Sequence, residues 1–170
     1  MANNAIKRPY VQIPTMSDIV NKLQGAERFT KLDLKEAYHQ IVLSESSRHI
    51  TTFYGPDGLY RYKRLNYGTK SAQDILQTQM QKMLSGIPHQ VNIADDILIG
   101  GTVDERDLAL KQVLSVLKNR GITLNPILVA NIITLLILNH NATLTQQNQR
   151  SAFKSAIMKI VCVPPEEAGN

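Results

Sequence analysis

Residues 91–99 read VNIADDILI, an apolar segment interrupted by the adjacent carboxylates of Asp95 and Asp96. Two neighbouring carboxylates repel each other, and a divalent cation bound beside them would relieve that repulsion. Asp-Asp also suits the two-residue turn of a β-hairpin, which would need no ligand. The segment therefore predicts an acidic turn between two strands, and a metal site is one of two explanations for it.

A second segment, residues 29–41 with the sequence FTKLDLKEAYHQI, favours the metal explanation. Its first half alternates with a period of two, which predicts a strand over about 28–34 with Asp33 at its end, on the face opposite the flanking leucines. Central strands lying side by side would bring Asp33 against Asp95 and Asp96. Three carboxylates in one cleft suit Mg²⁺, which prefers hard oxygen ligands. Two such ions about 4 Å apart are the arrangement for phosphoryl transfer.

The surrounding residues, 15–126, read as a regular alternation of helices and strands. Three pairs resemble helix-starting capping boxes: Thr15 with Asp18, Ser71 with Asp74, and Thr102 with Glu105. Runs rich in Thr, Tyr and Phe at 49–54 and 59–64 flank a Gly-Pro-Asp-Gly turn, and 122–124 could form a last short strand. Because the strands come mostly in adjacent pairs, we expect an α+β fold in which an antiparallel sheet has helices packed on one face.

The composition limits the class of protein. Of the 170 residues, 43% are hydrophobic and 19% charged, which provides a core and excludes a wholly disordered chain, a fibre or a disulfide scaffold. The single Cys162 can form neither an intramolecular disulfide nor a thiolate zinc site. The net charge of +5 is compatible with a polyanionic partner without requiring one.

Two further features bear on localisation. The N-terminal residues lack the apolar core of a secretory signal. The most apolar run, 127–138, is shorter than the about 20 residues that a membrane span needs. We therefore expect an intracellular chain without a membrane partner, and the sequence does not distinguish cytoplasm from nucleus.

Three motifs, in order, resemble the reverse transcriptase domain of gypsy-type long-terminal-repeat retrotransposons and their retroviral relatives. The first palm motif of that family, Phe-Ser/Thr-x-Leu-Asp-Leu-x-x-Gly-Tyr-His-Gln-Ile, is similar to residues 29–41. The second is similar to residues 65–77 (LNYGTKSAQDILQ), and the third, Tyr/Phe-x-Asp-Asp followed by Ile-Leu-Ile, to residues 93–99. The resemblance covers about residues 6–126 and implies a reverse-transcriptase palm with partial fingers, followed by a divergent tail over 127–170.

The resemblance implies a catalytic and metal-binding role for three carboxylates. Asp33, Asp95 and Asp96 would hold two Mg²⁺ (or Mn²⁺) ions, with the backbone carbonyl of Leu34 helping to hold the ion beside the nucleotide. The reaction would be RNA-directed DNA polymerisation, with an RNA or DNA template-primer and dNTPs as partners.

The resemblance also implies nucleotide-binding residues: Leu34, Tyr38, Tyr67, Gly68 and Gln77. Tyr38 would stack under the sugar, and Tyr67 and Gly68 would lie against the incoming nucleotide. Simpler explanations stay open for three of them. Tyr38 could be a half-buried helix aromatic, Gly68 could serve a turn, and Gln77 could be an ordinary polar helix position.

A basic patch is interleaved with tyrosines between the first and third motifs. Its cations are Arg61, Lys63, Arg64 and Lys70. Phosphates bind cations and unpaired bases stack on rings, so this patch is a candidate surface for the template strand. A solvated charge run is the alternative explanation.

The sequence departs from the family in several places. Ile93 stands where the family has an aromatic residue, and Asn66 and Gln73 replace two prolines. The fingers segment that would precede these residues, the thumb and the ribonuclease H parts of a polyprotein have no counterpart among the 170 residues. We therefore expect weak or absent polymerisation by the isolated chain. The alternative function is a non-catalytic truncated remnant with at most weak nucleic-acid binding. We also expect residues 127–170 to lack a stable fold of their own and to be trimmed by proteases.

Overall fold

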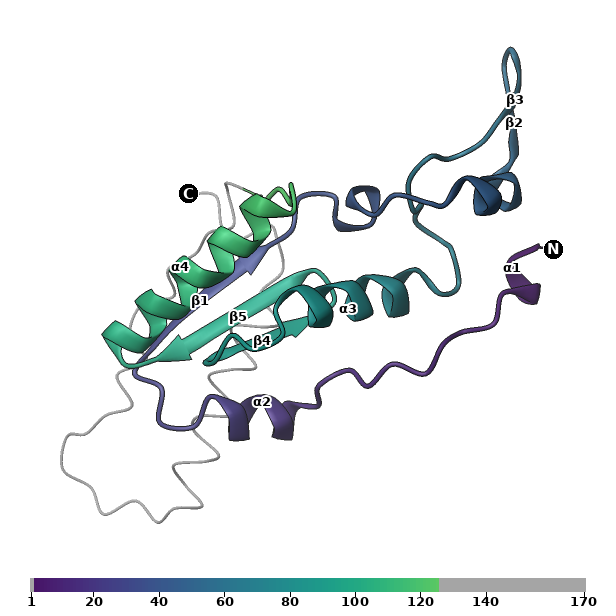
Figure 1. Cartoon of the computed structure of the whole chain (residues 1–170). Helices are drawn as coiled ribbons and strands as arrows, with labels where there is room; N and C mark the ends of the chain where they lie inside the picture. Colours follow the sequence, from purple (N-terminus) through teal and green to yellow (C-terminus); the bar gives the residue numbers. More distant parts are fainter. Residues whose placement is uncertain (1, 126–170) are drawn as a thin grey trace, which may run out of the picture.

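The computed structural model describes residues 2–125, and an antiparallel sheet of three strands lies at its centre (Figure 1). In order across the sheet the strands are β1 (Arg28–Asp33), β5 (Asp96–Gly101) and β4 (Gln90–Ile93). The predicted hairpin is confirmed, with Ala94 and Asp95 in the turn and Asp96 as the first residue of β5. The pairing places Asp33 opposite Asp96, so the end of β1 meets the hairpin turn.

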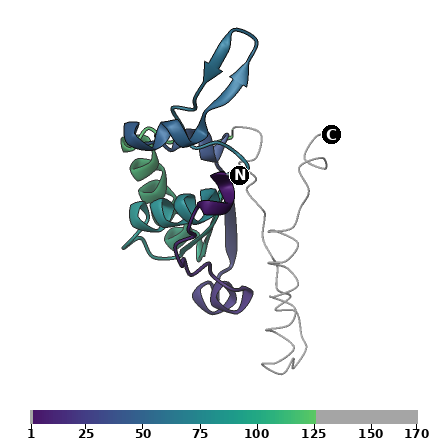
Figure 2. The same cartoon turned by 90° about the vertical axis from the view of Figure 1, so that its right-hand side faces the viewer.

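The two long helices, α3 (Ala72–Met83) and α4 (Val103–Asn119), pack on one face of this sheet (Figures 1 and 2). The sheet residues in the core between them are those that the strand alternation points to this side, such as Leu32, Ile97 and Ile99. The helices contribute to the same core the stripe residues Leu76, Met80, Leu84, Ala109, Val113 and Leu117. Burying each Leu or Ile contributes about 1.5–3 kcal/mol, so this cluster carries much of the fold's stability. The α+β class with an antiparallel sheet is confirmed.

A third helix, α2 (Met16–Lys22), packs on the opposite face, which the expectation of helices on one face did not include. The core between α2 and this face of the sheet consists of Ile19, Val20, Leu23, Ala26, Phe29, Val91 and Leu98. The alternation of β1 and β5 turns Phe29 and Leu98 to this side, and these apolar side chains require cover. Farther along the same face the strands carry Lys31, Asp33 and Asp96, which are only partly buried.

Two of the three predicted capping boxes are confirmed. The Thr15 and Thr102 side chains each accept a hydrogen bond from the backbone N–H of the acidic residue three positions later, and that carboxylate accepts in return. The box at Ser71 was a wrong prediction, because Ser71 makes no side-chain capping bond. The Asp74 carboxylate is instead buried and bound by both Arg8 Nε (2.7 Å) and Arg8 Nη2 (2.9 Å).

The second hairpin is shorter than the sequence predicts. It comprises β2 (Phe53–Gly55) and β3 (Gly58–Tyr60), and it projects away from the central sheet (Figure 1). The residues before it form a 3₁₀ helix, η2 (Glu45–Thr51). The predicted last strand is reduced to a single bridge between Leu34 and Leu124. Two short helices complete the described part, α1 (Ala2–Ala5) and the 3₁₀ helix η1 (Ala37–Gln40).

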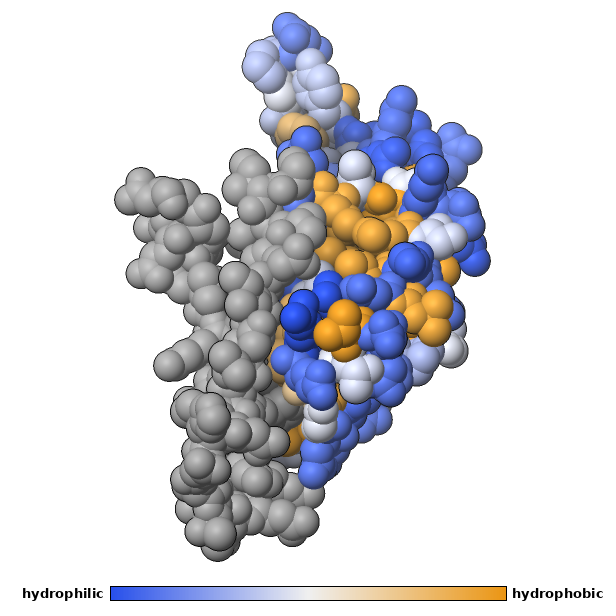
Figure 3. All heavy atoms as spheres, turned by 90° about the vertical axis from the view of Figure 1, so that its left-hand side faces the viewer, coloured by the Kyte–Doolittle hydropathy of each residue, from blue (hydrophilic) through white to orange (hydrophobic). Residues whose placement is uncertain are grey.

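The outer side of α4 leaves three apolar side chains more than a third exposed, Val103, Leu108 and Leu114. Figure 3 shows apolar surface lying between polar side chains on the left-hand side of the molecule as drawn in Figure 1. Between residues 2 and 125, no helix has the length and apolar character needed to cross a membrane. The predicted tail over 127–170, with its expected proteolysis, lies outside the described residues.

Candidate active site

The structure brings the three predicted catalytic carboxylates to one end of the sheet. Asp33 and Asp96 are direct partners on neighbouring strands, so their side chains leave the sheet on the same face, with Cα atoms about 4.5–5.5 Å apart. Asp95 precedes Asp96 in the turn, and its backbone oxygen accepts a hydrogen bond from the Leu34 N–H at 3.1 Å. This bond ties the acidic turn to the end of β1.

The surroundings of the carboxylates leave part of their negative charge uncompensated. Burial raises the pKa of Asp33, a hydrogen bond with Asn125 lowers it, and the charge of Asp95 raises it further. Burial also raises the pKa of Asp96, and the hydrogen bond and charge of Lys31 oppose this effect. Lys31 Nζ lies 3.0 Å from Asp96 Oδ2. Lys31 thus offsets part of the charge of Asp96 and Asp33, and the remaining negative charge at this end of the sheet favours a further cation.

The donor set fits a hard divalent ion in its chemistry and strand register, but it is not preassembled. Nowhere in residues 2–125 are three His, Cys, Asp or Glu side chains arranged so that they could hold a metal ion together. Asp95 is exposed on the turn, and Asp96 is engaged by Lys31. Binding of Mg²⁺ or Mn²⁺ through the three carboxylates would therefore require side-chain movement, and binding through Asp96 Oδ2 would require the Lys31–Asp96 ion pair to open.

Gln77 holds the acidic turn from the helical side. It is fully buried on α3; its Nε2 donates to the Asn92 carbonyl at 3.1 Å, and its Oε1 accepts from the Ala94 N–H at 2.7 Å. Ala94 has a left-handed φ of 52°, an uncommon conformation for a residue with a side chain. Both amide atoms of Gln77 thus bind the hairpin backbone, and the structure shows the side chain supporting the acidic turn. A polar residue beside an apolar helical stripe was the available sequence signal for this role.

The predicted aromatic residues border the acidic turn. The Tyr38 and Tyr67 rings meet edge to face with centroids 4.9 Å apart, and the His39 ring lies 5.2 Å from that of Tyr67. Burial raises the pKa of Tyr38, and the charges of Asp95 and Tyr67 raise it further. Tyr67 is largely exposed, and Gly68 beside it has a left-handed φ of 82°, so a turn requires this glycine.

The predicted basic residues Arg61, Lys63, Arg64 and Lys70 are all exposed. They lie on the segment that runs from β3 to the start of α3. Arg64 has a structural role as well, because its Nη1 donates to the carbonyls of His39 (3.1 Å) and Gln40 (3.4 Å). The patch is thereby anchored next to the aromatic residues.

Sequence reasoning missed the N-terminal segment as a part of this region. Besides the Arg8–Asp74 pair, the Asn3 side chain donates to the Gly68 carbonyl (2.9 Å) and accepts from the Lys70 N–H (2.8 Å). These contacts join residues more than 60 positions apart, which no local pattern can reveal. The two Asn3 hydrogen bonds hold the loop that carries Tyr67 and Gly68 against the N-terminal segment.

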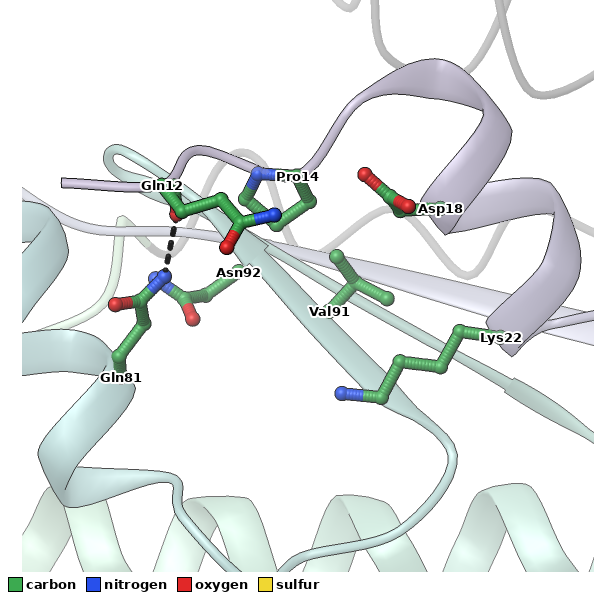
Figure 4. Close-up of a pocket in the computed structure, with 7 residues that line it drawn as sticks. All are labelled: Gln12, Pro14, Asp18, Lys22, Gln81, Val91 and Asn92. Atoms are coloured by element: carbon green, nitrogen blue, oxygen red, sulfur yellow. Dashed lines mark hydrogen bonds between the residues drawn. The ribbon is translucent and has the colours of Figure 1, made fainter.

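A cavity of about 340 Å³ lies apart from the predicted site residues, at the free edge of β4 (Figure 4). It is lined by Gln12, Pro14, Asp18, Lys22, Gln81, Val91 and Asn92. Gln81 Nε2 donates to the Gln12 carbonyl across it at 3.0 Å, as the dashed line in Figure 4 shows. None of the sequence-predicted site residues lines this cavity, so the candidate active site is the carboxylate end of the sheet.

Comparison with known sequences gives a consistent result. A family profile described as "Reverse transcriptase (RNA-dependent DNA polymerase)" matches residues 1–127. The retrovirus-related Pol polyprotein from transposon 412 of Drosophila melanogaster is 36% identical over 117 residues, covering 67% of this chain and 10% of the relative. The transposon Tf2-3 polyprotein of Schizosaccharomyces pombe is 32% identical over 126 residues, covering 72% of this chain and 10% of the relative. The chain thus spans about a tenth of the length of these curated relatives.

Comparison with solved structures shows the same fold. The foamy viral protease-reverse transcriptase dRH in complex with double-stranded DNA superposes with a TM-score of 0.65 at 21% identity, covering 72% of this chain and 22% of that one. The foamy viral protease-reverse transcriptase in complex with an RNA/DNA hybrid gives a TM-score of 0.65, covering 72% of this chain and 17% of that one.

Proposed function

This chain belongs to the reverse transcriptase (RNA-dependent DNA polymerase) family, and from that premise we propose that its carboxylate cluster catalyses nucleotidyl transfer to a primer strand. It carries the reverse transcriptase domain found in retrotransposon and retroviral polyproteins. The observation that carries the proposal is the direct pairing of Asp33 with Asp96, with Asp95 in the adjoining turn. The template-primer would be RNA or DNA, and the substrates dNTPs.

The residues that would hold two Mg²⁺ or Mn²⁺ ions are Asp33, Asp95 and Asp96, together with the backbone carbonyl of Leu34. Bound ions of this kind polarise the attacking hydroxyl and neutralise developing phosphate charge. The contribution of the chain is to keep the three carboxylates together at one end of the sheet. The Leu34–Asp95 backbone bond and the two bonds of Gln77 hold the turn against β1 and α3. Gln77 therefore acts on the site by positioning it.

The nucleotide would lie against Tyr38, Tyr67 and Gly68. Tyr38 supports this assignment because it is half-buried beside Tyr67 and within electrostatic reach of Asp95. The template strand would contact the exposed basic side chains of Arg61, Lys63, Arg64 and Lys70. Nucleic acid as a partner is also supported by the two structures of the foamy viral protein, which was solved with double-stranded DNA and with an RNA/DNA hybrid.

A second function, a non-catalytic nucleic-acid-binding remnant, is favoured by one observation. Among residues 2–125 no three potential metal ligands are arranged so that they could hold an ion together, and Asp96 is paired with Lys31. The two functions differ in whether divalent ions bind through the aspartates.

The test combines Mn²⁺ binding, followed by electron paramagnetic resonance, with primer extension on an RNA template at low salt. We expect Mn²⁺ to bind the chain and Asp96→Asn to weaken binding at least tenfold and abolish any extension. Glu27→Gln is the matched control, because it also removes one carboxylate, from an exposed site before the opposite end of β1. Equal Mn²⁺ binding by the Asp96 variant and the control, with no extension by either, would favour the remnant.

A further inference from the structure

Lys31 is placed to interact with the metal-binding carboxylates from within the same sheet. It stands two residues before Asp33 on β1, so the alternation of the strand turns both side chains to one face. Its strand partner is Leu98, two residues after Asp96 on β5. The Lys31 ammonium reaches along the face to Asp96 Oδ2 at 3.0 Å, and the two side chains are only 18% and 26% exposed.

The ion pair and a metal ion would compete for the same oxygen. Mg²⁺ binds carboxylate oxygens at about 2.0–2.1 Å and demands near-ideal octahedral geometry. An ammonium group 3.0 Å from Asp96 Oδ2 occupies the space where such an ion and its waters would lie, and two cations there repel each other. The ion pair must therefore open before Asp96 Oδ2 can serve as a ligand. Lysine is suited to this movement, because its ammonium sits on a flexible four-carbon stem.

When no metal ion is bound, the carboxylates at this site repel one another. Asp33 and Asp96 face each other across one strand pair, and Asp95 adjoins them in the turn. Like charges directly opposite in a sheet are destabilising. Lys31 supplies a positive charge that reduces this repulsion while no metal is bound.

We propose that Lys31 is a positioning residue that stands in for a divalent ion at Asp96 and sets the ion concentration at which the site fills. The proposal rests on the proposed function, because the carboxylates are the same. It goes beyond that function by assigning to a neighbouring lysine the control of metal occupancy. The ion displaces the Lys31 ammonium from Asp96, and the ammonium returns when the ion leaves.

The test compares Lys31→Met with Lys35→Met, each measured for Mn²⁺ affinity by electron paramagnetic resonance. Lys35 is an exposed lysine just beyond β1, so both variants lose one positive charge and only one loses the ion pair. We expect Lys31→Met to bind Mn²⁺ about tenfold more tightly than Lys35→Met. This is the effect of removing a unit charge about 6 Å away at an effective dielectric constant of about 40, between the surface and bulk-water values. Lys31→Arg, which keeps the charge, should bind like the wild type.

Two further measurements separate this role from a general effect on folding. Without metal, Lys31→Met should melt at a lower temperature than Lys35→Met, and saturating Mn²⁺ should raise its melting temperature by the larger amount. In an Asp96→Asn background, Lys31→Met should raise Mn²⁺ affinity by a smaller factor than in the wild-type background, because the ion pair is already lost.

The outcomes distinguish this inference from the proposed function. If Mn²⁺ binding depends on Asp96 but is equal in Lys31→Met and Lys35→Met, or weaker in Lys31→Met, the role of Lys31 is overturned and the metal site stands. If Asp96→Asn leaves wild-type binding unchanged, the metal site itself fails. Absence of Mn²⁺ binding in every variant overturns both.

Discussion

Replacing Gln77 by leucine tests whether a buried amide holds the acidic turn. Leucine is similar in size to glutamine and suits the apolar surroundings of α3, so the substitution removes hydrogen bonds without opening a large cavity. The two groups left without their partner are the Asn92 carbonyl and the Ala94 N–H, which Gln77 binds at 3.1 and 2.7 Å. The perturbation is therefore confined to the turn that carries Asp95.

The expected loss of stability follows from these two backbone groups. An unsatisfied buried donor or acceptor costs about 1–3 kcal/mol. Asn92 is buried, whereas Ala94 is partly exposed and can recover part of its loss by binding water. We expect a total of about 2–3 kcal/mol in the free energy of unfolding. With a urea m-value of about 2 kcal/mol/M, the unfolding midpoint should fall by about 1 M.

Urea denaturation of Gln77→Leu beside Gln79→Leu provides the measurement. Gln79 is exposed on the same helix, so its substitution controls for helix propensity and for the added leucine. Mn²⁺ affinity should also fall in Gln77→Leu alone, because Asp95 loses the support of its turn. A difference between the two variants of less than about 0.5 kcal/mol in the free energy of unfolding would refute the role of Gln77 in holding the turn. Surface substitutions alone produce changes of that size.

Three other outcomes are expected. Because burial raises the folded-state pKa of Asp33 above its ordinary value of 3.8, the ionised group opposes folding above that folded pKa, and the opposition is relieved as the pH falls through it. Asp33→Asn should accordingly melt at a higher temperature than the wild type at pH 7, with the difference shrinking toward pH 4; a constant difference would contradict this. The hydrogen bond from Arg8 lowers the pKa of Asp74, so the stabilisation is present above the unfolded pKa and lost as the pH falls through the folded one. In melts across pH 2–7, Arg8→Met should therefore lose less stability on acidification than the wild type, and parallel curves would argue against the pair. Thr102→Ala should reduce the free energy of unfolding by about 1 kcal/mol through loss of the α4 cap. The mid-helix Ser115→Ala serves as its control in the same urea assay, and equal midpoints would count against the cap.

Features that depend on neighbouring residues were predictable from the sequence. The Thr15 and Thr102 caps involve residues three positions apart, and the sequence predicts both correctly. The alternation in residues 28–34 predicts β1 and places Asp33 at its end. The expectation that central strands lie side by side linked Asp33 to the acidic hairpin, the family resemblance supported that link, and the strand register agrees with it.

Features that depend on distant residues were decided by the tertiary structure. Asp74 lost its predicted capping role because Arg8, 66 positions away, reaches it with a bidentate ion pair. Helix α2 took the face opposite α3 and α4 because Phe29 and Leu98 required cover there. The second hairpin was shortened because residues 45–51 turned into a 3₁₀ helix, which the strand propensity of Thr and Phe does not reveal.

The candidate site divides in the same way. Local sequence determined which residues carry carboxylates and at which strand ends they lie, because strand alternation and turn chemistry act over a few residues. Only the tertiary structure decided that Asp96 is held by Lys31 and that Gln77 supports the acidic turn. Both contacts depend on how two strands and a helix pack together. The physical reason is that a side chain's partner is set by packing in three dimensions, whereas sequence patterns specify only the element on which the side chain stands and the face from which it projects.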